Sequence, residues 1–196
     1  MKRALNVVWM VVLGAVLGNG CGCGEGKHLK KFHEEKILLG AFVQVDVCAP
    51  ANEAVAVEQS FHDVWDRLAQ IDQRMNVYDS SSDVAMINAA AGKPVAVHPD
   101  VREVIRQTIE FSRLTDGMFD ITVRPLIVLW KQAAETRQLP DAAALKNTLQ
   151  DVGFDKIIFN SHDEVQLKGA AQLDLSGIGQ GYAADEAARI LRSAGW

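Results

Sequence analysis

Leu173-Asp174-Leu175-Ser176-Gly177-Ile178-Gly179-Gln180-Gly181-Tyr182 joins an apolar segment to a helix through three glycines at alternate positions. Glycine lets a backbone approach a ligand without a Cβ in the way. The first turn of a helix offers free N–H groups and a partial positive charge, which suit a phosphate. The same pattern suits a tight strand-to-helix turn that needs glycine for packing. The glycine spacing does not match the dinucleotide fingerprint, and the P-loop lysine is absent.

Two further polar clusters precede this stretch. In Thr115–Val123, two acids bracket a glycine and an apolar pair, so Met118 and Phe119 could line a flat aromatic ligand while Asp120 accepts hydrogen bonds from it. An ordinary glycine turn with acidic caps is the alternative. The other cluster, Met75–Asp79, follows an amphipathic helix, and its Tyr78 could either stack on a ring system or pack at the helix end.

The hydrophobic pattern predicts an α+β fold in which amphipathic helices pack on a largely antiparallel sheet. Helices are expected over residues 54–75, 83–88, 126–134 and 141–149, from Pro99 to about residue 114, and after the glycine stretch. The helix that starts at Pro99 is expected to bury Val101, Val104, Ile105, Ile109 and Phe111. Strands are expected over residues 37–47, 95–97, 156–160, 164–168 and 171–175.

Composition sets limits on the function. The chain has 196 residues, with 20 basic and 25 acidic side chains, so its net charge is 20 − 25 = −5. This charge argues against a nucleic-acid binder, which needs clustered Lys and Arg. With 48% hydrophobic residues the chain is too apolar for wholesale disorder. The three cysteines show no zinc-binding spacing.

The first residues resemble an export signal. A basic start at Met1-Lys2-Arg3 precedes an apolar run and small residues, which predicts a signal peptide over residues 1–20; an uncleaved anchor is the alternative. Gly20-Cys21 resembles a bacterial lipoprotein cleavage site, with Cys21 lipidated. Residues 21–36 are then a flexible tether, and residues 37–196 form the domain. We therefore expect a membrane-anchored lipoprotein of the bacterial cell envelope facing the periplasm, with Cys48 buried inside the domain.

Taken in order, the clusters resemble the FAD:protein FMN transferase (ApbE) family over about residues 37–195. The matching pieces are Leu39-Gly40-Ala41, Met75–Tyr78 with Ser82-Asp83 and Asn88, Thr115–Asp120 with Pro125-Leu126 and Leu129-Trp130, and Asp174–Asp185. The resemblance implies an ApbE-like (T-fold-like) antiparallel sheet with packed amphipathic helices. Two departures stand out: Leu39-Gly40-Ala41 replaces the usual Met-Gly-Thr, and Gln180 stands where Lys or Glu is common.

The resemblance also implies an activity. Family members use Mg²⁺ to transfer FMN from FAD to a Thr or Ser side chain of an acceptor flavoprotein, here an extracytoplasmic one. It implies a backbone-carbonyl ligand to Mg²⁺ at Gly177 and, as FAD contacts, Leu39, Tyr78, Met118, Phe119, Asp120, Asp174 and Gln180. No catalytic side chain is assigned. This role for Gly177 favours the ligand-binding interpretation of the glycine stretch over the packing one.

Family chains continue past the position of Trp196, into further strands and an Asp/Thr-containing segment that supplies side-chain Mg²⁺ ligands. The resemblance therefore covers the N-terminal portion of the family domain, and we expect the domain in this chain to be incomplete. Two alternatives to the transferase follow from this expectation. One is a flavin-trafficking lipoprotein that binds or hydrolyses FAD, and the other is a truncated, inactive remnant.

Overall fold

The computed structural model describes residues 29–196, so the expected signal peptide and Cys21 lie outside the described residues. The described chain divides into two compact units, where the sequence indicated one domain. Unit 1 comprises residues 29–69 and 183–196, and unit 2 comprises residues 70–182. Helices α1 (Ala54–Met75) and α6 (Gly179–Ser193) each contribute residues to both units. No helix of residues 29–196 is long and apolar enough to cross a membrane.

Unit 1 is built on an antiparallel hairpin of β1 (Leu29–Leu38) and β2 (Ala41–Pro50). Its turn is Leu39-Gly40, where φ is +54° and +69°. The expected single strand over residues 37–47 is instead the end of β1, a turn and most of β2. Residues 29–36, the described part of the tether expected over residues 21–36, lie in β1. The hydrophobic pattern did not indicate β1 because the strand is rich in charged residues. A strand at the edge of a sheet pairs through its backbone and tolerates Lys and Glu side chains.

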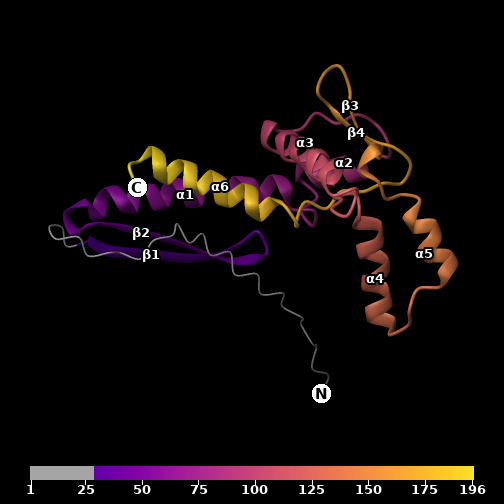
Figure 1. The fold of residues 1–196 in the computed structure, drawn as a ribbon, viewed down its shortest axis with the longest axis horizontal. Coiled ribbons are helices and arrows are strands. Elements are labelled where there is room, and N and C mark those ends of the chain that lie inside the picture. The colour runs from indigo at the N-terminus through magenta and orange to yellow at the C-terminus, as the bar shows by residue number, and fades with distance from the viewer. Residues whose placement is uncertain (1–28) are drawn as a thin grey trace. The chain divides into compact units, whose positions relative to one another are not determined.

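Helices α1 and α6 lie side by side in unit 1 and cover one face of the hairpin (Figure 1). A short 3₁₀ turn, Ala51–Glu53, leads from β2 into α1. The buried side of α1 includes Val57, Val64 and Leu68. Arg67 Nε donates to Glu186 Oε2 at 2.8 Å and joins the two helices. The bounds expected for the helix over residues 54–75 are confirmed.

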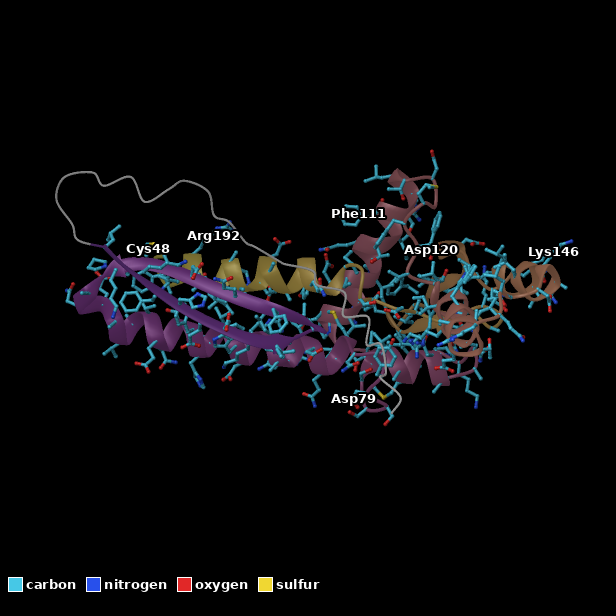
Figure 2. The ribbon with its side chains drawn as sticks, turned by 90° about the horizontal axis from the view of Figure 1, so that it is seen from below. Cys48, Asp79, Phe111, Asp120, Lys146 and Arg192 are labelled. Carbon is cyan, nitrogen blue, oxygen red and sulfur yellow. The ribbon has the colours of Figure 1, made fainter. Side chains whose placement is uncertain are left out.

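Cys48 lies on β2 and is exposed, so the expectation that it is buried is wrong (Figure 2). The reason is the strand's alternation. Val47 and Ala49 point into the core, and the residue between them must point the other way.

Unit 2 surrounds a second small hairpin with short helices. Its elements are α2 (Asp83–Ala89), α3 (Pro99–Leu114), α4 (Arg124–Thr136), α5 (Ala142–Leu149), a 3₁₀ turn (Phe154–Lys156), β3 (Ile157–Phe159) and β4 (Val165–Leu167). Strands β3 and β4 pair antiparallel. Two expected strands are reduced to single bridges, Val95 with Val165 and Gln172 with Val123. The described residues thus hold two small antiparallel sheets with packed helices.

The core-facing side of α3 departs from expectation at its C-terminal end. Val101, Val104 and Ile105 are fully buried as expected, whereas Phe111 is 48% exposed and its predicted burial is wrong (Figure 2). Leu114 is also exposed, whereas Ser112 in the same turn is fully buried. Phe111 and Leu114 therefore lie on the side of the last turn that faces away from the core.

Candidate functional site

The three sequence clusters converge in unit 2. Asp174 N donates to Ile121 O at 2.8 Å, which joins the glycine stretch to the cluster around Phe119. Asn88 joins the same stretch to α2 through both ends of its amide: Nδ2 donates to Leu173 O at 2.9 Å, and Oδ1 accepts from Leu173 N at 2.7 Å. Segments 85 residues apart in sequence are thereby fixed against one another.

The Asp174 carboxylate is 6% exposed and lies where the apolar segment turns toward α6. Ser176 donates to its Oδ1 twice, from the backbone N at 3.0 Å and from Oγ. Its Oδ2 lies 3.6 Å from Arg124 Nη1. These contacts fix the position of the carboxylate at the start of the glycine stretch.

Two cations from α4 surround the ring of Tyr78. The Arg124 guanidinium lies 5.3 Å from the ring centroid and the Lys131 ammonium 4.6 Å from it. Lys131 Nζ also donates to the Tyr78 hydroxyl at 2.5 Å. The ring itself is 68% exposed, so it remains accessible to a stacking ligand.

The residue after Tyr78, Asp79, is favoured as an anion. Hydrogen bonds from the side chain and the backbone of Ser81 keep the pKa of Asp79 below its usual value. Oδ1 of Asp79 accepts both bonds, from Ser81 Oγ at 2.7 Å and from its N at 2.9 Å. This loop therefore has a defined local structure next to the ring of Tyr78.

The glycines at 177, 179 and 181 are not required by the turn. None of the three has a positive φ. A Cβ at Gly177 would lie 3.4 Å from Phe119 Cε2, one at Gly179 would lie 3.8 Å from Met75 Sδ, and one at Gly181 would meet nothing. Neither backbone conformation nor crowding excludes a Cβ at these positions, so the packing interpretation loses support. The glycines are compatible with close approach of a ligand to the backbone.

Asp120 organises the turn after α3. Its Oδ1 accepts from both the N and the Oγ1 of Thr122, each at 2.7 Å. The buried Thr122 Oγ1 in turn accepts from Gly153 N at 2.7 Å. At least one carboxylate oxygen of Asp120 is thus hydrogen-bonded within the turn, which leaves fewer acceptor sites for a ligand.

The model of the ApbE family matches residues 39–196. The chain belongs to the ApbE family. A relative named FAD:protein FMN transferase from Chlamydia pneumoniae is 27% identical over 174 residues, which cover 84% of this chain and 52% of the relative. The structure of the ApbE protein from Thermotoga maritima has a TM-score of 0.74 at 26% identity and covers 85% of this chain and 54% of that one. The apo flavinyl transferase ApbE from Pseudomonas stutzeri has a TM-score of 0.72 at 27% identity, covering 86% and 56%. This ApbE-family chain spans about half the length of the curated relatives it matches.

Most of the predicted contacts of this ApbE-family chain lie in unit 2. Tyr78 and Asp174 are linked through Arg124, and Phe119 lies beside Gly177. The others are more scattered: Gln180 is half-buried in the first turn of α6, Met118 is 89% exposed, and Leu39 lies in the hairpin turn of unit 1. Their contacts with FAD stay predictions.

Arg124 and Lys131 were missed by the sequence analysis. They are seven residues apart, close to two helical turns, and so share a face of α4. That spacing is a signal that could have pointed to them.

Magnesium is the weaker fit. Among residues 29–196 no group of three or more His, Cys, Asp or Glu is placed to hold a metal ion. Mg²⁺ prefers octahedral oxygen coordination and is usually bound through one or two carboxylates together with substrate phosphates. The nearest carboxylate to Gly177 in the chain, Asp174, already accepts from Ser176 and pairs with Arg124. The Gly177 carbonyl as a Mg²⁺ ligand stays a prediction.

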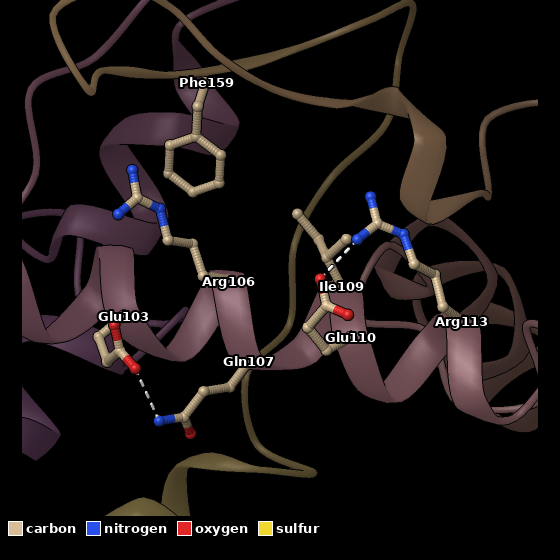
Figure 3. A pocket seen from close by; sticks show the side chains of 7 residues that line it. All are labelled: Glu103, Arg106, Gln107, Ile109, Glu110, Arg113 and Phe159. Carbon is tan, nitrogen blue, oxygen red and sulfur yellow. Dashed lines mark hydrogen bonds and ion pairs between the residues drawn. The ribbon is translucent and has the colours of Figure 1, made fainter.

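Two hollows in unit 2 lie away from the predicted contacts. One, of 460 Å³, runs along the outer side of α3 and is lined by Glu103, Arg106, Gln107, Ile109, Glu110, Arg113 and Phe159 (Figure 3). Arg106 there stacks on Phe159 at 4.8 Å and pairs with Asp163 at 2.5 Å. The other, of 280 Å³, includes Asn88 in its lining. Neither contains a predicted FAD contact.

Proposed function

We propose that unit 2 binds FAD and that this chain supplies the FAD-binding part of an FAD:protein FMN transferase. The acceptor is a Thr or Ser side chain of a flavoprotein outside the cytoplasm. The observation that carries the proposal is the convergence of Tyr78, Phe119 and Asp174 around a glycine stretch whose glycines the fold itself does not require. The names of the relatives support the same activity.

The chemistry of the cluster suits this substrate. The exposed Tyr78 ring offers a stacking face, and the glycine stretch lets a diphosphate approach the backbone near the first turn of α6. In the transfer, the acceptor oxygen bonds to the phosphorus of the FMN moiety and the P–O bond to AMP breaks. The hydroxyl proton is released, and AMP leaves with the electron pair of the broken bond.

The proposed activity depends on Mg²⁺. When bound, the ion would neutralise charge on the phosphates of FAD. Gly177 would contribute its carbonyl oxygen, and the phosphates of FAD themselves would supply further oxygens. Among the described residues, no group of three or more His, Cys, Asp or Glu side chains is placed to complete the coordination.

The proposed location is the periplasmic face of a bacterial membrane, with a lipid on Cys21 as the anchor. The basic start, apolar run and Gly20-Cys21 junction support it. Labelling with a radioactive fatty acid and membrane fractionation of the Cys21→Ser variant would test it. Unchanged labelling of that variant would contradict the assignment.

A second candidate is motivated by the lack, among residues 29–196, of a group of three or more His, Cys, Asp or Glu side chains that could hold a metal ion: the chain binds FAD, or hydrolyses it, without transferring FMN. One experiment separates the candidates. The full chain is titrated with FAD by flavin fluorescence, then incubated with FAD, Mg²⁺ and a Thr-bearing acceptor, and a denaturing gel is imaged for a fluorescent acceptor band. A Thr→Ala acceptor and an EDTA reaction are the controls.

A fluorescent band that depends on Mg²⁺ and on the acceptor threonine supports the transferase. FAD binding without a band supports the second candidate. A cooperatively folded chain that binds no FAD overturns both.

A further inference from the structure

We propose that Arg124 and Lys131, here called the cationic pair, bind the diphosphate of FAD and make the site prefer a dinucleotide over uncharged riboflavin. The inference rests on the proposed function of the same site. Neither residue belongs to the contacts that the family resemblance implied. Both side chains lie at the ring of Tyr78, which is the most exposed of the aromatic rings among the predicted FAD contacts.

The fold brings the cationic pair to one place. Arg124 opens α4 and Lys131 follows two turns later on the same face. Both cations lie within 5.3 Å of the centroid of the Tyr78 ring. A flat ligand that stacks on this ring would therefore have two positive charges beside it.

The two cations differ in their partners. Arg124 faces Asp174, whereas Lys131 forms no ion pair among residues 29–196 and donates to the Tyr78 hydroxyl. The Arg124–Asp174 separation of 3.6 Å is longer than a charge-assisted hydrogen bond, which is typically about 2.7–2.9 Å. Arg124 is therefore not locked in a bidentate pair, and its planar guanidinium is suited to phosphate oxygens. A lysine ammonium without an ion-pair partner and a guanidinium beside an aromatic ring favour an anionic, ring-bearing ligand.

The cationic pair also borders the glycine stretch. Asp174, which faces Arg124, lies three residues before Gly177. The first turn of α6 carries no acidic side chain that would repel a phosphate. The backbone of the stretch and the cationic pair thus present positive potential from adjoining segments of unit 2.

Charge-removing variants test the inference. Lys131→Gln removes the exposed cation, and Lys146→Gln removes an equally exposed charge from α5 as a matched control. Dissociation constants for FAD are measured by flavin fluorescence at low and high salt. Riboflavin and ADP serve as probes of the two halves of the ligand.

We expect Lys131→Gln to weaken FAD binding about five- to tenfold at low salt, a discounted value for a charge-assisted contact at an exposed site. High salt should bring the variant and the wild type together, because it screens exposed charges. Riboflavin binding should not change, ADP binding should fall with FAD binding, and Lys146→Gln should match the wild type. Arg124→Gln should weaken FAD binding further, with Arg124→Lys recovering part of the loss.

Two results would overturn the inference: a Lys131→Gln affinity for FAD equal to that of the wild type, or a loss that salt does not reduce. A loss shared equally by riboflavin would also overturn it, since the lysine would then only support the Tyr78 ring. Failure of the wild type to bind FAD at all is a different outcome, because it removes the proposed function itself.

Discussion

Replacing Asn88 by alanine should destabilise unit 2 strongly, although the residue lies on a short helix. Its amide makes a two-sided contact with the backbone of Leu173, at 2.9 and 2.7 Å. Leu173 is fully buried, so its two backbone groups depend on the Asn88 amide for their hydrogen bonds. Alanine would leave one donor and one acceptor of the main chain unpaired in the core.

The expected magnitude follows from those two groups. Each buried polar group left without a partner costs about 1–3 kcal/mol, which gives roughly 2–6 kcal/mol for the pair. Partial relaxation of the structure around Leu173 should place the loss of unfolding free energy in the lower half of that range, at about 3 kcal/mol. For a chain of this size about 1 kcal/mol corresponds to roughly 2–4 °C, so the midpoint of thermal unfolding should fall by about 6–12 °C.

The assay is urea unfolding followed by far-UV circular dichroism, with thermal melts in parallel. Gln107→Ala is the control, because it removes an amide hydrogen bond of 2.9 Å to Glu103 at an exposed position. Surface changes of this kind usually stay within about 0.5 kcal/mol. If Asn88→Ala shifts the midpoint no more than this control, the amide does not hold the segment and the reasoning fails.

Asn88→Asp makes the same test sharper. A carboxylate can accept from the N–H of Leu173 but cannot donate to its carbonyl, whereas a protonated carboxyl can do both. Burial against a carbonyl raises the pKa of the new group in the folded state. The variant should therefore be most stable relative to the wild type below about pH 4 and lose stability as the pH rises through the folded pKa. A stability difference that does not change with pH would contradict the contact.

Three other substitutions probe separate contacts. Ser82→Ala removes the N-cap of α2 and should lower the free energy of unfolding by about 1–2 kcal/mol in urea titrations. Tyr182→Phe removes a hydrogen bond of 3.1 Å to Asp100 and should cost about 1 kcal/mol by the same measurement; no loss would show that the bond is replaced by water. The Arg189 hydrogen bond holds the pKa of Glu186 below its usual value of 4.5, so the stability it contributes is present above pH 4.5 and lost as the pH falls through the folded pKa. Glu186→Gln should therefore fall below the wild type at neutral pH and converge with it in acid, and a constant gap would argue against the pair.

The sequence predicted helix positions well where the apolar residues of a long helical period are buried against the rest of the fold. The helix from Ala54 to Met75 was expected at its observed bounds, because its apolar residues recur at spacings of three and four and most of them are buried. Phe111 fits a similar period but stays 48% exposed, because the buried face of that turn is centred on Ser112. Periodicity reports which side chains can share a face, and tertiary structure decides whether that face is covered.

Strands were harder to place for a different reason. The apolar run Ala171–Leu175 was expected to pair with a neighbouring strand, yet the Asn88 side chain takes both backbone groups of Leu173. No local pattern shows that a side chain 85 residues away will replace a strand. The candidate site was likewise only partly predictable. Residue types in the sequence pointed to the three clusters, whereas the role of Arg124 and Lys131 depends on their distances to Tyr78 in the fold.

The backbone around Asp174 also offers a way to follow local opening of the site. Leu173 N–H is held by α2 through Asn88, while the adjacent Asp174 N–H is held by Ile121 O. Amide exchange at these two neighbours should therefore report two different openings, one in which α2 separates and one in which the segment after α3 releases. A ligand that slows exchange at only one of these two amides would show whether it contacts the α2 side of the site or the segment after α3.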